Sequence, residues 1–201
     1  MWIKICGMTT REAVSAALEA QVDAIGFVFA DSPRQLAPPA ASLLAQPARG
    51  RVRCVAVTCH PTQQALDEIL AAFKPDVLQT DVADLRMLRL PWQLELLPVL
   101  RGVDSEQASL PARLLFEGLA SGAGMPSDWA TAGRIARRAQ LVLAGGLNAT
   151  NVASAIAEVQ PFGVDVSSGV EERRGVKSPA EIVRFVSAAR TDIAQHRRTP
   201  V

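Results

Sequence analysis

The chain has 201 residues, of which 49% are hydrophobic and 20% are charged, and its formal net charge is +1. This balance predicts one globular domain with a large core and excludes an intrinsically disordered chain. With 21 basic against 20 acidic residues and no tyrosine, the chain lacks the basic field and the aromatic platforms of a nucleic-acid-binding protein.

The sequence carries no signal for secretion or for membrane insertion. No stretch approaches the ~20 apolar residues of a membrane span, and residues 1–13 lack the apolar run of a signal peptide. The cysteines are Cys6, Cys54 and Cys59, too few and too scattered for a disulfide framework or for the paired spacing of a zinc site. We therefore expect a cytoplasmic protein with reduced thiols and no metal, in which Cys54 and Cys59 are ordinary core or surface residues.

Short runs rich in Val, Ile and Leu alternate with amphipathic helical patterns along the whole chain. Thr9 or Thr10 is expected to cap the first helix. In chain order the predicted elements are strand 2–6, helix 10–20, strand 24–29, helix 38–44, strand 52–57, helix 62–73, strand 77–80, helix 82–88, strand 95–100, helix 104–110, strand 113–117, helix 128–138, strand 140–144, helix 151–159, strand 163–167 and helix 179–193.

The alternation of strand and helix predicts a parallel α/β sheet, and eight such units predict a compact, single-domain (β/α)8 TIM barrel. We expect the barrel to span residues 1–194 and a basic tail to span residues 195–201. The patterns of helices 82–88 and 104–110 are thin, so an open doubly wound sheet is the alternative fold.

In a barrel of this kind the reactive groups lie at the carboxyl ends of the strands. Strand 2–6 places Lys4 and Cys6 on one face and Ile3 and Ile5 on the other. The face that holds Lys4 should point into the barrel, where a neighbouring positive charge lowers the pKa of the Cys6 thiol and favours a base or nucleophile. The alternative for Cys6 is a small buried hydrophobic residue.

Two further strand ends carry charged side chains. A Ser-Pro turn after strand 24–29 should hold Arg34 over the barrel mouth, where its guanidinium suits a carboxylate or phosphate, although a loop arginine is more often a solvated surface group. Alternation along strand 113–117 points Glu117 inward as a candidate general acid, whereas a one-residue slip would point Phe116 inward instead. Asp128 is most simply a helix N-cap.

The loops after the last two strands have the composition of a phosphate site. The loops that follow the seventh and eighth strands of such barrels often bind phosphate through backbone N–H groups. Asp165 alternates inward and either pairs with Lys4 across the seam between the first and last strands or contacts substrate. The glycines at 122 and 124 are weaker evidence for a ligand. The candidate phosphate-binding residues are Gly145, Gly146, Ser167, Ser168 and Gly169.

Four segments, in this order, carry a resemblance to a known family. They are KICGMT at 4–9, GFVFADSPR at 26–34, LAGGLNATNV at 143–152 and GVDVSSGVE at 163–171. Together they resemble the phosphoribosylanthranilate isomerases of tryptophan biosynthesis, and the resemblance spans nearly the whole chain.

The resemblance implies a (β/α)8 barrel that performs an Amadori rearrangement of N-(5'-phosphoribosyl)anthranilate to 1-(2-carboxyphenylamino)-1-deoxyribulose 5-phosphate, with no cofactor or metal. It places the general base on Cys6 and substrate contacts on Arg34 and Asp165. It also places the phosphate site on the Gly145–Gly146 and Ser167–Gly169 loops.

The sequence departs from the family pattern at the ends of the middle strands. The family's general acid is an aspartate at the end of strand six, and we assign that position to Glu117. Strand four of the family usually ends in Gln-Leu-His-Gly, but here Gln79 is followed by Thr80 and Asp81, so we keep Gln79 as a substrate contact and the histidine is absent. Arg101 takes the place of a family lysine near the end of strand five.

Two other functions fit parts of this pattern. Another phosphosugar-processing barrel would explain the phosphate loops but not Cys6, and the two histidines of the chain, His60 and His196, are too few for the His-rich metal site of an epimerase. A non-catalytic phosphosugar-binding protein would explain the missing aspartate and histidine. We expect an active, monomeric enzyme with a phosphosugar–anthranilate substrate and no nucleic-acid or membrane partner.

Overall fold

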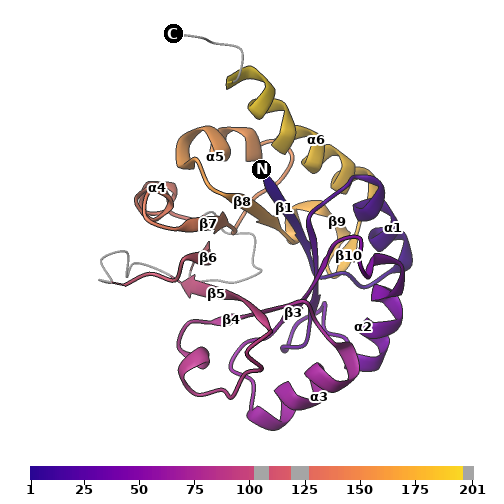
Figure 1. Cartoon of the computed structure of the whole chain (residues 1–201). Coiled ribbons are helices and arrows are strands. Elements are labelled where there is room, and N and C mark those ends of the chain that lie inside the picture. Colours follow the sequence, from indigo (N-terminus) through magenta and orange to yellow (C-terminus); the bar gives the residue numbers. More distant parts are fainter. Residues whose placement is uncertain (102–108, 119–126, 197–201) are drawn as a thin grey trace.

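The computed structural model describes residues 1–101, 109–118 and 127–196, and its parallel strands close into a barrel in the order β1 to β8 (Figure 1). Every predicted strand is present with ends that agree within one residue, and the closed order excludes the open sheet. The predicted (β/α)8 fold is thus confirmed. The strands are β1 (Trp2–Cys6), β2 (Ala24–Val28), β3 (Arg53–Val57), β4 (Val77–Asp81), β5 (Glu95–Arg101), β6 (Arg113–Glu117), β7 (Gln140–Leu143) and β8 (Gly163–Val166).

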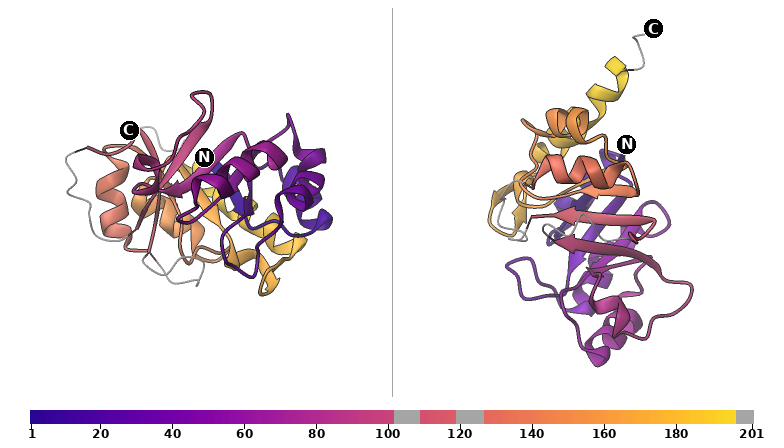
Figure 2. Two further views of the ribbon diagram at one scale, coloured as in Figure 1. Left: turned by 90° about the horizontal axis from the view of Figure 1, so that it is seen from below. Right: turned by 90° about the vertical axis from the view of Figure 1, so that its left-hand side faces the viewer.

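The described α-helices lie on the outside of the barrel but leave β5 uncovered (Figure 2). The Thr10 side chain caps the first helix by accepting from the Ala13 N–H at 3.2 Å, as predicted. In the described part of the chain, no helix has the length and apolar composition needed to cross a membrane. Residues 197–201 of the predicted tail lie outside the described part. The α-helices are α1 (Arg11–Glu19), α2 (Pro38–Ala45), α3 (Gln63–Phe73), α4 (Trp129–Ala136), α5 (Val152–Val159) and α6 (Pro179–His196).

The predicted helix 82–88 is wrong, because only the 3-10 helix η2 (Asp84–Arg86) forms there. This segment buries little apolar surface, since no residue of η2 is buried and Met87 is 83% exposed, and a short helix with so little packing is unstable. Most of the predicted helix 104–110 lies outside the described residues. The glycines at 122 and 124 lie outside them as well.

Sequence analysis also missed a small hairpin between β8 and α6. After the 3-10 helix η3 (Ser168–Val170), the strands β9 (Glu171–Arg173) and β10 (Val176–Lys177) pair antiparallel. Gly175 has a φ of +86°, and a Cβ there would lie 2.7 Å from the Pro33 carbonyl oxygen, so the hairpin turn requires glycine. The hairpin therefore packs against the loop after β2, at the mouth of the barrel.

The core has two layers, which follow from the alternation of side chains along the strands. Small and medium aliphatic residues fill the inside of the barrel, while Ile3, Ile5 and Cys54 face outward into the layer between strands and helices. Lys4 shares the inner face with Cys6, as predicted, and is fully buried. The strand register sets Lys4 opposite Asp165 on β8. The inner layer consists of Ala24, Val55, Val77, Leu97, Val99, Leu115, Val142 and Ala144.

Candidate active site

A cavity of about 550 Å³ opens at the carboxyl ends of the strands. All the residues predicted to be catalytic or to contact substrate outside the phosphate loops line it, namely Cys6, Arg34, Gln79, Glu117 and Asp165. A cavity of about 690 Å³ lies at the opposite end of the barrel, among residues such as Trp2 and Arg53 at the strand starts. We place the candidate site in the smaller cavity, because the reactive groups of a (β/α)8 barrel gather at the carboxyl ends of its strands.

Cys6 lies beside a buried ion pair. The Lys4 ammonium contacts the Asp165 carboxylate at 2.8 Å, and both side chains are buried. Burial raises the pKa of the Cys6 thiol above its ordinary value of 9.0, although the positive charges of Lys4 and Lys177 oppose this shift. The expectation that the nearby cation would lower the pKa of Cys6 is therefore wrong in its net direction, because the loss of hydration outweighs the attraction.

Arg34 is held over the cavity by a partner that sequence analysis did not identify. Its Nε and Nη2 donate to the two carboxylate oxygens of Glu171 at 2.6 and 2.9 Å, and Lys177 donates to the same carboxylate at 2.7 Å. A Cβ on Gly7, whose φ is +81°, would lie 2.5 Å from Arg34 Cδ, so Gly7 makes room for the guanidinium stem. Arg34 is 6% exposed and is not the solvated loop residue of the alternative interpretation.

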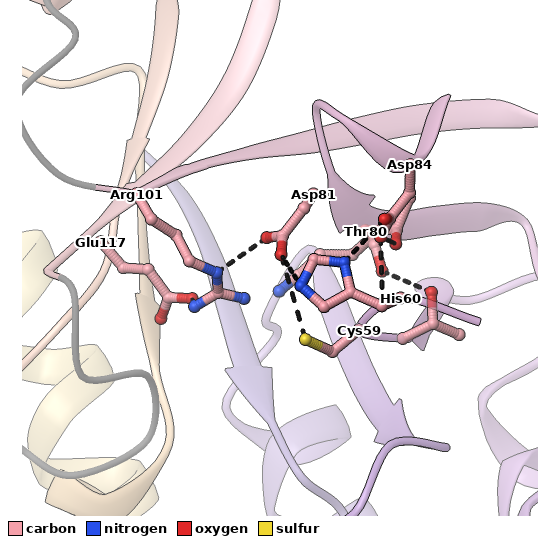
Figure 3. Close-up of polar contacts among 9 residues, drawn as sticks. Cys59, His60, Thr80, Asp81, Asp84, Arg101 and Glu117 are labelled. Atoms are coloured by element: carbon pink, nitrogen blue, oxygen red, sulfur yellow. Dashed lines mark hydrogen bonds and ion pairs between the residues drawn. The ribbon is translucent and has the colours of Figure 1, made fainter. Parts of the chain in front are cut away.

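Arg101 joins two carboxylates at the ends of β4 and β6, the two neighbours of its own strand β5 (Figure 3). Its Nε donates to Asp81 Oδ1 at 2.7 Å, and its Nη1 forms an ion pair with Glu117. Glu117 points into the cavity, so the strand has not slipped by one residue. Gln79 is buried on the same side, and its Oε1 has no hydrogen-bond partner among the described residues. A buried acceptor of this kind is disfavoured unless a ligand supplies a donor.

The predicted phosphate loops lie side by side. Gly145 and Gly146 have φ angles of +91° and +65°, which favour glycine. A Cβ on Gly169 would lie 1.9 Å from the Leu147 carbonyl oxygen, so the loops after β7 and β8 touch. Four of the five predicted residues, all except Gly169, line a small cavity next to the first, and Glu117, Asp165 and Ser167 line both.

Asp128 lies outside the site. It caps α4, with its Oδ1 accepting from the Thr131 N–H at 3.1 Å, and it does not line the cavity. The N-cap interpretation of Asp128 is confirmed.

Sequence analysis also missed a polar cluster next to Arg101. Cys59 and His60 follow β3, and the barrel brings them beside Asp81 at the end of β4 (Figure 3). The sequence carries a signal for this cluster, because residues 59–60 and 81 lie at the ends of neighbouring parallel strands.

Comparisons with known proteins identify the family of the chain. The family model described as N-(5'phosphoribosyl)anthranilate (PRA) isomerase matches residues 3–188. A curated isomerase of that name from Rhizobium etli CFN 42 is 38% identical over 209 residues, which cover 94% of each chain. The solved phosphoribosyl anthranilate isomerase of Thermus thermophilus has a TM-score of 0.82 at 26% identity and covers 98% of this chain and 100% of its own.

A second solved structure contains a ligand. It is a phosphoribosyl anthranilate isomerase in complex with reduced 1-(o-carboxyphenylamino)-1-deoxyribulose 5-phosphate, with a TM-score of 0.77 at 27% identity and coverage of 94% of this chain and 98% of its own. The resemblance found in the sequence is confirmed by the family match and by relatives above 30% identity over most of the chain. The chain therefore belongs to the N-(5'-phosphoribosyl)anthranilate isomerase family.

Proposed function

We propose that this chain rearranges N-(5'-phosphoribosyl)anthranilate to 1-(2-carboxyphenylamino)-1-deoxyribulose 5-phosphate, with Cys6 as general base and Glu117 as general acid. The observation that carries the assignment is the single cavity lined by a thiol from β1 and a carboxyl group from β6. These strands are three places apart in the closed barrel, so the two groups approach a molecule in the cavity from different directions. The steps are proton transfers, which such side chains supply without a cofactor.

The first step opens the ribofuranose ring. Glu117 donates a proton to the ring oxygen, the ring C–O bond breaks, and the anthranilate nitrogen supplies the electron pair that forms the Schiff base. This step needs Glu117 in its neutral form, whereas the structure pairs its carboxylate with Arg101. The substrate carries a carboxylate and a phosphate of its own, and both suit a guanidinium. Binding of these anionic groups therefore competes with Glu117 for Arg101.

The second step removes the proton at C2′. The Schiff base withdraws electrons and acidifies this proton, and the Cys6 thiolate accepts it to give an enolamine that becomes the ketose. Lys4 and Lys177 stabilise the thiolate, although burial favours the thiol. Each proton transfer contributes roughly 10²–10⁴ in rate.

The remaining site residues hold the substrate between acid and base. The loops with Gly145 and Gly146 and with Ser167, Ser168 and Gly169 bind the phosphate through backbone N–H groups. Arg34, Gln79 and Asp165 contact the sugar or the anthranilate. Gln79 supports this role most directly, since its buried Oε1 has no partner among the described residues.

A coupled assay with purified chain and freshly generated substrate tests the proposal. We expect turnover together with binding of the reduced product analogue. Binding of the analogue without turnover would overturn the proposal in favour of the non-catalytic binding protein.

We further propose that the enzyme works as a monomer in the cytoplasm, with residues 1–194 as its domain and 195–201 as a tail, and without a nucleic-acid or membrane partner. Cys6, Cys54 and Cys59 are all free, as thiols in a reducing compartment are. Light scattering coupled to gel filtration measures the oligomeric state, and a dimer mass would contradict the proposal.

A further inference from the structure

Three different metal-ligating side chains meet at the edge of the active-site cavity. Cys59 Sγ, His60 Nε2 and one carboxylate oxygen of Asp81 all lie within 4.8 Å of one another (Figure 3). All three residues line the same cavity as Cys6 and Glu117. The proposed rearrangement uses neither Cys59 nor His60.

The two separations that involve Asp81 are close to those around a tetrahedral zinc ion. Zinc bonds of about 2.3 Å to sulfur and about 2.0–2.2 Å to nitrogen and oxygen imply separations of roughly 3.4 Å between nitrogen and oxygen and roughly 3.6 Å between sulfur and oxygen. The observed separations from Asp81 Oδ2 are 3.5 Å to His60 Nε2 and 3.9 Å to Cys59 Sγ. Small side-chain adjustments would complete the geometry.

Neighbouring groups orient two of the three ligands. His60 Nδ1 contacts Asp84 Oδ1 at 2.8 Å, which leaves Nε2 for the cluster. The other oxygen of Asp84, Oδ2, accepts from the Thr80 hydroxyl at 2.6 Å and from the backbone N–H of His60 at 3.1 Å. Arg101 engages Asp81 Oδ1 and leaves Oδ2 facing His60 and Cys59. A carboxylate behind a histidine ligand is the usual outer-shell arrangement of zinc sites.

We propose that Cys59, His60 and Asp81 form a binding site for Zn²⁺ at the edge of the cavity. The mixture of thiolate, imidazole and carboxylate favours this borderline-soft ion over Mg²⁺ or Ca²⁺, which prefer oxygen ligands. Binding releases the Cys59 thiol proton to solvent. Three protein ligands leave the fourth position open toward the cavity, where water or an anionic group of the substrate would complete the coordination.

The site also predicts inhibition. A bound ion withdraws charge from the Asp81 carboxylate that also pairs with Arg101, so it weakens the ion-pair chain that ends at Glu117. It also occupies part of the cavity that receives the substrate. We therefore expect Zn²⁺ to inhibit isomerisation reversibly and a chelator to restore it. Only this consequence rests on the proposed function, because the binding of the ion itself is independent of turnover.

Titration of the metal-free chain with Co²⁺ and Zn²⁺ tests the site. We expect one equivalent of Co²⁺ to produce a thiolate-to-cobalt charge-transfer band and Zn²⁺ to remove it. The variants Cys59→Ser and His60→Gln should each weaken Zn²⁺ binding by at least about 100-fold. Asp84→Asn removes no metal ligand but weakens the support of His60, and it should weaken binding by roughly 10–100-fold. The matched control is Asp31→Asn, which removes an exposed carboxylate of the same cavity and should leave binding unchanged.

Cys6 provides the decisive comparison, because it is another thiol of the same cavity. Retention of the cobalt band in Cys6→Ser and its loss in Cys59→Ser would support the site. The reverse pattern, or equal Zn²⁺ affinity in wild type and Cys59→Ser, would overturn it. If the chain had no isomerase activity, the cobalt spectrum would still decide the question, so failure of the site and failure of the proposed function are separable.

Discussion

Removal of one charge from the buried pair Lys4–Asp165 should destabilise the fold far more than the same change at the surface. The variant Asp165→Asn keeps the shape of the side chain but removes the counter-charge of the Lys4 ammonium. The Lys4 side chain is 0% exposed, so water cannot replace that counter-charge. An uncompensated buried charge costs about 3–5 kcal/mol. For a domain of this size each kcal/mol lowers the melting temperature by roughly 2–4 °C, so we expect a decrease of roughly 6–20 °C.

The surface pair Arg113–Glu95 is the matched control. Its distance is also 2.8 Å, but its side chains are 33% and 36% exposed, so Glu95→Gln should cost no more than about 1 kcal/mol. Urea unfolding followed by circular dichroism gives both free energies. The double variant with Lys4→Met and Asp165→Leu should lose less stability than Asp165→Asn alone, because an apolar pair leaves no buried charge. Equal losses in Asp165→Asn and Glu95→Gln would refute the reasoning from burial.

Three further predictions follow from the site and its loops. Glu117→Gln should lower kcat by roughly 10²–10⁴ while binding of the reduced product analogue persists, and an unchanged kcat would move the acid elsewhere. Hydrogen bonds from Arg34 and Lys177 outweigh burial and hold the pKa of Glu171 below its ordinary 4.5, so this carboxylate contributes stability above that pH, which is lost as the pH falls through the lowered pKa. In denaturant titrations from pH 6 to pH 3, Glu171→Gln should therefore show a smaller acid loss than wild type, and parallel curves would contradict this. Gly169→Ala should destabilise by about 1–3 kcal/mol, because the new Cβ meets backbone, whereas Gly133→Ala, with nothing within 4 Å, should gain about 0.5–1 kcal/mol in the same thermal melts.

The local alternation of residue types was sufficient to predict the barrel and the inward side chains. Lys4 shows which face of β1 points into the barrel. A charged side chain on this strand is incompatible with the apolar layer under the helices, so the face that holds Lys4 must be the inner one. Asp165 follows by the same argument on β8, and the closure of the barrel then sets the two opposite each other. The predicted helix 82–88 failed because the alternation shows apolar residues but not whether the fold buries them, and no residue of η2 is buried.

Contacts between segments distant in the sequence could not be predicted in this way. Arg34 and Glu171 are 137 residues apart, and only the hairpin after β8 brings them together. The sign of the Cys6 pKa shift depends on the balance between burial and the nearby cations, and the sequence shows the cation but not the depth of burial. Arg101 was matched to a family lysine without the two carboxylates that it joins, which come from β4 and β6.

The role of Cys6 as general base is the central claim, and the most direct test is the kcat of Cys6→Ala in the coupled isomerase assay. The account predicts a fall of roughly 10²–10⁴ in kcat with binding of the reduced product analogue retained, while Cys54→Ala, which removes a buried thiol on the outer side of the barrel, keeps its kcat. A kcat close to wild type in Cys6→Ala would contradict the account.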